Sequence, residues 1–165
     1  LSDEDLLAVV ASRYEFVWLG QSYRATEMEA ALGIGQLERL DESLARRRAI
    51  AASLTAALAH PDLQLPSVAP GNEHAWMMYP IVCRTPEQRD AVVLALERAG
   101  VETRFLLPIL GQPCYEGVLE HPTGAFPVTE HAQANGFYIG CHPGMTDDDV
   151  TYVASIVQRT LGSAA

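Results

Sequence analysis

The chain has 165 residues, a hydrophobic content of 48% and a formal net charge of −10 at pH 7. This composition indicates a folded protein, long enough for one well-packed domain or a domain with an attached segment. The negative charge disfavours nonspecific nucleic-acid binding, because phosphates require a basic surface. No apolar run approaches the roughly 20 residues that cross a bilayer, so we expect no membrane partner.

The start of the chain is acidic rather than basic, which is not the pattern of a signal peptide and favours a cytoplasmic location. Leu1 is not a start methionine, so we expect the chain to begin inside a longer reading frame. Residues 3–12 predict a short helix, and residues 14–20 predict an extended segment.

A long helix is predicted over residues 25–60. Thr26 and Glu29 have the spacing of a capping box at its start. Apolar residues then repeat at helical intervals and predict a buried stripe: Leu37, Leu40, Leu44, Ala51, Leu54 and Leu58. Gly33 and Gly35 interrupt the pattern, which favours a kink or a close helix contact there.

Residues 76–83 predict a strand, in which Pro80 indicates a sheet edge or a local irregularity. Thr85 and Pro86 predict the start of the next helix, and Gly100 predicts its end.

A second strand is predicted at 101–107, a surface loop at 108–128 and a helix at 129–137. A short buried strand at 137–142 follows. The last helix is capped by Thr146.

These elements predict an α+β fold, with a short, largely antiparallel sheet covered by helices. We expect three parts: a segment at 1–24 from a preceding domain, the connecting helix at 25–60, and a small domain at 61–165.

Metal binding is not expected. The three cysteines, Cys83, Cys114 and Cys141, have no paired spacing, and the aspartates at 147–149 are explained by the helix start. The arginines at 46–48 are interpreted as a solvated helix face.

The run GQSYRATEMEAALGIGQL, residues 20–37, resembles a pattern of the DegT/DnrJ/EryC1/StrS family, in which Gly-x-x-Tyr-Arg is followed by Glu, Ala-Ala, Gly and Gln-Leu. Further matching segments follow in order: RRRAIAASL, HAWMMYPIV, GVETR, QPCY and GFYIGCHPGMTDDD. Together they extend from about residue 14 to residue 160.

This resemblance implies a fold-type-I enzyme that uses pyridoxal phosphate (PLP) on nucleotide-linked keto-sugars. Such enzymes are homodimers with active sites between subunits, and a larger N-terminal domain supplies the lysine that holds the cofactor. The chain resembles the C-terminal part alone. All 11 of its basic residues are arginine, so we expect no catalytic residue here and no activity from this chain by itself.

The resemblance implies that Ser22 and Arg24 lie near the cofactor phosphate of the neighbouring subunit. Alternatively, Arg24 anchors its loop through a carboxylate such as Glu27. The resemblance also makes Arg104 and Tyr115 candidate substrate-binding residues.

A guanidinium such as that of Arg104 suits a diphosphate, because its fork matches two oxygens. A surface salt bridge is the alternative role for Arg104. Tyr115 and His142 can equally be packed or loop residues.

Two other functions stay open. The segments GFYIGCH and ETR…QP also resemble a sugar 3-dehydratase branch, in which histidine replaces the cofactor lysine. A noncatalytic dimerisation or regulatory module is the third alternative, in which the apolar stripe serves as the interface.

Overall fold

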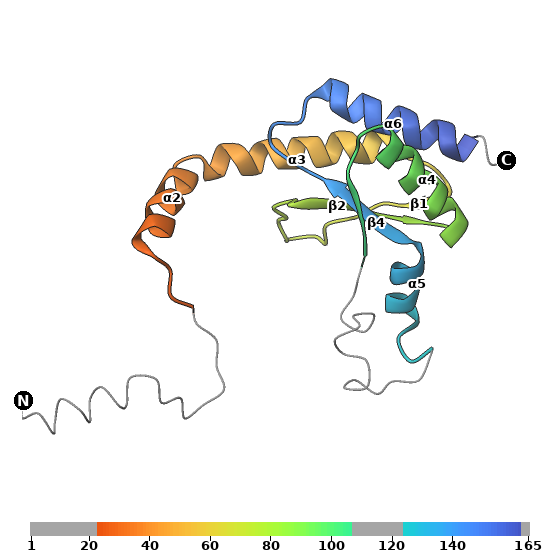
Figure 1. Cartoon of the computed structure of the whole chain (residues 1–165), viewed down its shortest axis with the longest axis horizontal. Helices are drawn as coiled ribbons and strands as arrows, with labels where there is room; N and C mark the ends of the chain where they lie inside the picture. The colour runs from red at the N-terminus through yellow and green to blue at the C-terminus, as the bar shows by residue number, and fades with distance from the viewer. Residues whose placement is uncertain (1–22, 107–123, 163–165) are drawn as a thin grey trace, which may run out of the picture. The chain divides into compact units, whose positions relative to one another are not determined.

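The computed structural model describes residues 23–106 and 124–162 (Figure 1). The helix expected at 3–12, the extended segment at 14–20 and most of the loop expected at 108–128 lie outside these residues. By its internal contacts the chain divides into two compact units, Leu1–Glu38 and Arg39–Ala165.

Helix α2, Glu27–Leu37, belongs to the first unit. The predicted capping box is confirmed: the Glu29 backbone N–H donates to Thr26 Oγ1 at 3.2 Å, and the Thr26 N–H donates to the Glu29 carboxylate at 2.7 Å. These bonds satisfy donors that the first helical turn leaves unpaired. Within the described chain none of the residues of α2 is buried.

Helix α3, Leu40–Ala57, begins the second unit. The single helix expected over 25–60 is therefore two helices, divided at Glu38 and Arg39. Arg39 has φ −111° and ψ 8°, outside the helical range, and its carbonyl accepts from Ser43 to start the next helix. A kink or close helix contact was expected at Gly33 and Gly35, but α2 runs through both glycines and the break lies after them.

The predicted apolar stripe is buried only in its second half. Ala51, Leu54 and Leu58 are at most 2% exposed, whereas Leu37 and Leu40 are 68% and 44% exposed. The expectation that the whole stripe is buried was wrong for its first two leucines. The helical spacing is present there, but no part of the described chain covers those side chains.

Among the described residues, the sheet has four strands in the order β1-β2-β4-β3. Their bounds are β1 Leu63–Gln64, β2 Met78–Cys83, β3 Thr103–Phe105 and β4 Gly136–Gly140. Each neighbouring pair is antiparallel, which confirms the predicted sheet type and the α+β class.

Pro80 lies in β2, between β1 and β4 in the strand order. Strand β1 pairs only with Val82 and Cys83, so it does not reach Pro80. The proline therefore occupies a position that β4 pairs on one side and β1 leaves free on the other. This position suits a residue without an N–H, although the strand as a whole is not at the edge.

Three further helices complete the second unit: α4 Pro86–Arg98, α5 Pro127–Asn135 and α6 Asp147–Gly162. The predicted caps of α4 and α6 are confirmed. The Gln88 N–H donates to Thr85 Oγ1 and the Asp149 N–H donates to Thr146 Oγ1, both at 3.2 Å. Gly100 ends the α4 turn with φ +81°, a conformation that favours glycine.

The core lies between one face of the sheet and helices α3, α4 and α6. Helix α6 packs against both α3 and α4, as Figure 1 shows. Tyr79 and Ile81 of β2 and Phe137 and Ile139 of β4 are at most 2% exposed beneath them. The Tyr79 hydroxyl is paired with Thr55 at 2.7 Å, so its burial leaves no unsatisfied oxygen.

The arginines at 46–48 were expected on a solvated face, but their side chains hold two loops against α3. Each guanidinium donates to a backbone carbonyl: Arg46 to Met145 at 2.5 Å, Arg47 to Trp76 at 3.1 Å and Arg48 to His74 at 3.2 Å. Arg48 also pairs with Glu73 at 2.6 Å. Charged donors make strong bonds to carbonyls, so this run fixes loops that are distant in sequence.

Candidate functional site

The structure describes two of the four residues that the sequence singled out for binding. Arg24 lies in the first compact unit and Arg104 in the second. Ser22 and Tyr115 lie outside the described residues.

Arg24 stands two residues before the Thr26 cap of α2, and its side chain is exposed. The Glu29 carboxylate accepts hydrogen bonds from Thr26 in the helix cap, and these bonds lower the pKa of its carboxyl. Within residues 23–106 and 124–162, no ion pair joins Arg24 to Glu27. Arg24 is thus an exposed cation at the start of a helix, where anions are favoured.

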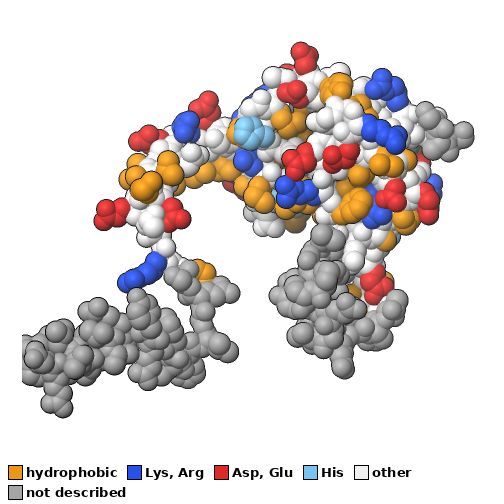
Figure 2. Space-filling view, in the orientation of Figure 1, with side chains coloured by type: hydrophobic (Ala, Val, Ile, Leu, Met, Phe, Trp, Pro, Cys, Tyr) orange, Lys and Arg blue, Asp and Glu red, His pale blue; other side chains and the backbone are white. Residues whose placement is uncertain are grey.

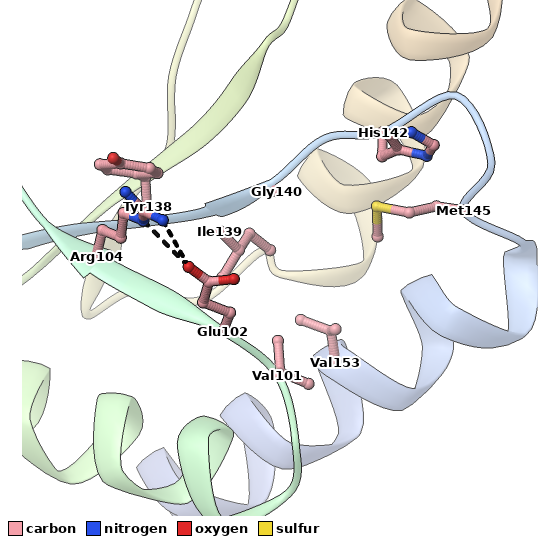
Figure 3. Close-up of a pocket in the computed structure, with 9 residues that line it drawn as sticks. All are labelled: Val101, Glu102, Arg104, Tyr138, Ile139, Gly140, His142, Met145 and Val153. Carbon is pink, nitrogen blue, oxygen red and sulfur yellow. Dashed lines mark hydrogen bonds and ion pairs between the residues drawn. The ribbon is translucent and has the colours of Figure 1, made fainter.

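Around Arg104, the second unit has a hollow of about 340 Å³ (Figure 3). It opens where β3 begins and β4 ends, because these antiparallel strands pair Thr103 with Ile139. Its polar side chains are Glu102, Arg104, Tyr138 and His142, and its apolar side chains are Val101, Ile139, Met145 and Val153.

Arg104 and Tyr138 are direct cross-strand partners. Since alternate residues of a strand face opposite sides, and Ile139 faces the core, Tyr138 faces away from it. Sequence reasoning missed Tyr138. The alternation within 136–140 indicates that its side chain leaves the core, but only the pairing register places it beside Arg104.

The Arg104 guanidinium is paired with Glu102. The Nε and Nη2 atoms of Arg104 both donate to Glu102 Oε1, at 3.1 and 2.8 Å (Figure 3). These bonds raise the pKa of the guanidinium further. The side chains are 66% and 75% exposed, so the pair adds little stability. The salt bridge that the sequence offered as one role for Arg104 is therefore present.

His142 lies in the loop between β4 and α6, at the far side of the hollow from Arg104 (Figure 3). The Gly144 N–H donates to its Nδ1 at 3.0 Å, which leaves the ring proton on Nε2. The Met145 N–H donates to the His142 carbonyl, and Arg46 binds the Met145 carbonyl from α3. These bonds fix the loop that carries His142 at the edge of the hollow.

The described residues hold no group of three His, Cys, Asp or Glu side chains arranged to bind a metal ion. Asp149 accepts from the Thr146 N–H and hydroxyl at 2.8 and 2.7 Å, which lowers the pKa of its carboxyl. Cys83 is a buried free thiol, and burial raises its pKa to about 11.

Apolar side chains gather on α2, as Figure 2 shows. Met28 is 78% exposed, Leu32 71% and Ile34 61%. A cluster of exposed apolar side chains on one short helix is typical of an interaction surface. Among the described helices, none has the length and apolar character needed to cross a membrane.

Comparison with known proteins identifies one family. The model of the DegT/DnrJ/EryC1/StrS aminotransferase family matches residues 7–158. The lipopolysaccharide biosynthesis protein RfbH of Salmonella typhimurium is 29% identical over 156 residues, which cover 91% of this chain and 36% of that protein. A GDP-perosamine synthase of Caulobacter vibrioides is 31% identical over 156 residues, or 90% of this chain and 41% of that enzyme.

A solved structure has the same fold. The aminotransferase TlmJ from Streptoalloteichus hindustanus superimposes with a TM-score of 0.77 and 27% identity, covering 92% of this chain and 40% of that one. The chain thus spans about two fifths of the length of the proteins that it matches.

Proposed function

The chain belongs to the DegT/DnrJ/EryC1/StrS aminotransferase family, and we propose that it is the C-terminal part of a PLP-dependent enzyme that transfers an amino group to a nucleotide-linked keto-sugar. The observation that carries the proposal is the family match over residues 7–158, together with a relative named GDP-perosamine synthase. Sugar and polysaccharide biosynthesis is the setting that the names of the relatives support.

The residues of this chain do not form a complete PLP site. In a transaminase, PLP acts as an electron sink and is carried on an amine of the enzyme, and the sequence contains no lysine. Arg24 lies exposed rather than in an enclosed pocket of the described chain. The cofactor and its lysine would therefore come from a preceding domain, and this chain alone would be inactive.

The chain would instead supply ligands at the margin of the active site. Ser22 and Arg24 would bind the cofactor phosphate; the position of Arg24 before a helix N-terminus supports this role, because both attract anions. Arg104 and Tyr115 would bind the substrate, and the hollow around Arg104 supports that role for the arginine.

We further propose that the enzyme is a cytoplasmic homodimer. The exposed apolar side chains of α2 support a contact with a second subunit, because a folded protein seldom leaves several large apolar side chains of one helix in water. Arg24, two residues before this helix cap, would then lie close to the subunit boundary.

Dehydration of the sugar is the alternative reaction, with histidine in place of the cofactor lysine. The segments GFYIGCH and ETR…QP favour it. A noncatalytic dimerisation module is the third possibility, and the exposed face of α2 is compatible with it.

Sequencing of the coding region upstream of Leu1 separates these functions. A PLP domain with lysine at the cofactor-linking position is the result that we expect. Histidine at that position would replace amine transfer with dehydration, and the absence of any PLP domain would leave the noncatalytic module.

A further inference from the structure

The hollow beside Arg104 does not have the charge of a phosphate site. Glu102 Oε1 already accepts from Nε and Nη2 of Arg104, so that edge of the guanidinium is occupied. The pair has no net charge. A diphosphate entering here would meet the Glu102 carboxylate, whose repulsion offsets the attraction of the guanidinium.

The same pair suits a hydroxyl group. A guanidinium has five N–H donors; two of those of Arg104 bond to Glu102 and its side chain also hydrogen-bonds to Tyr138, which leaves donors for a ligand, and within the described residues Glu102 Oε2 accepts no bond. A sugar hydroxyl both donates and accepts, so one hydroxyl or two adjacent ones can bond to both partners. His142 lies across the hollow from this pair, and its Nδ1 accepts from the Gly144 N–H.

Apolar groups also line the hollow. The Tyr138 ring stands beside Arg104 on the face of the sheet away from the core, and Ile139, Met145 and Val153 line the part toward the core (Figure 3). A pyranose ring has C–H groups on its faces and hydroxyls around its edge, and it can contact an aromatic ring while its edge hydroxyls bond to polar side chains. A phosphate has no apolar face to place here.

The size of the hollow limits what it can hold. Its volume of about 340 Å³ is near the lower end of the range for small-molecule sites, roughly 300–1,000 Å³. One ring fits such a volume more readily than a complete nucleotide-linked sugar. The hollow therefore suits a single part of the ligand.

We infer that this hollow binds the uncharged sugar ring of the ligand, and that Glu102 is the residue that makes Arg104 select hydroxyls over phosphates. The link to a nucleotide-linked substrate rests on the proposed function. The preference of the hollow for hydroxyls over phosphates does not rest on the proposed function, because it can be measured without catalysis.

The test uses the complete 165-residue chain with four probes: the methyl glycosides of glucose, galactose and mannose, and inorganic pyrophosphate. NMR signals of the Tyr138 ring and the Arg104 Nε–H report binding. We expect at least one glycoside to shift these signals with a Kd on the order of millimolar, and pyrophosphate to bind more weakly. Glu102→Gln should tighten pyrophosphate binding about fivefold, since it removes one charge close to Arg104, and should weaken glycoside binding.

Glu87→Gln is the matched control, because Glu87 is an exposed carboxylate of α4 that does not line the hollow. It should leave both affinities unchanged. Tighter binding of pyrophosphate than of every glycoside by the unmodified chain would overturn the inference. So would unchanged affinities in Glu102→Gln, or no shift of these signals with any glycoside. None of these results depends on whether the whole enzyme transfers an amine, so a failure here is separate from a failure of the proposed function.

Discussion

Arg47→Met should destabilise the second compact unit more than the same change at the adjacent Arg48. Arg47 is half-buried, and its Nη1 donates to the Trp76 carbonyl at 3.1 Å. Trp76 has φ +49°, a left-handed conformation that costs an L-residue roughly 1–2 kcal/mol. The Arg47 bond helps to hold this conformation, together with a bond of 2.9 Å from the Trp76 N–H to His74 Nδ1.

The size of the effect follows from the bond that is lost. A hydrogen bond from a charged donor contributes about 1.5–3 kcal/mol, and partial solvent access lowers that figure, so we expect a loss of about 1–2 kcal/mol. Methionine keeps most of the length of the apolar stem, which limits the loss of packing. The melting temperature should fall by roughly 3–8 °C.

Arg48→Met is the matched control. The Arg48 side chain is 41% exposed and its partner Glu73 is 78% exposed, so the loss should stay below about 1 kcal/mol. Urea unfolding followed by circular dichroism measures both variants. An equal or larger loss for Arg48→Met would refute the role assigned to the Arg47–Trp76 bond.

Three further results are expected. Leu54→Ala, at a side chain with 0% exposure, should lower the free energy of unfolding by about 2–5 kcal/mol. Leu94→Ala, at 52% exposure, should change it by less than about 0.5 kcal/mol. Urea unfolding measures both variants, and similar losses would contradict the assigned core. The native pKa of Asp149 is lowered, so its contribution to stability is present above the unfolded value of about 3.9 and is lost as the pH falls through the native value. The melting-temperature difference between the unmodified chain and Asp149→Asn should therefore shrink below about pH 4, and a difference that persists in strong acid would exclude this carboxylate as the cause. Cys83, with a pKa of about 11, should resist iodoacetamide near pH 8 in the folded chain and react after unfolding, as peptide mass spectrometry would show; rapid labelling of the folded chain would contradict its burial.

The parts of the fold that depend on neighbouring residues were predictable. Thr26 with Glu29, Thr85 with Gln88, and Thr146 before its aspartates each define a helix start through contacts within three or four residues. Such contacts join residues within one helical turn, so the sequence pattern is sufficient to identify them.

The parts that depend on tertiary contacts were not predictable. Nothing in the run 46–48 indicates that its guanidinium groups bond to carbonyls some 25 to 100 positions away, since those partners are backbone atoms that any residue carries. The hollow depends on the register that sets Arg104 opposite Tyr138, and a strand of three residues carries too little pattern to fix a register. Strand β1, with two residues, has no periodicity to detect.

The most direct test of the central claim is an assay of the complete protein that contains this chain, given PLP, an amino donor and a nucleotide-linked 4-keto-sugar. We predict an aminated sugar, detected by mass spectrometry, and one equivalent of the 2-oxo acid formed from the donor. A product that has lost water without gaining nitrogen, or a protein that binds no PLP, would contradict the assignment as an aminotransferase.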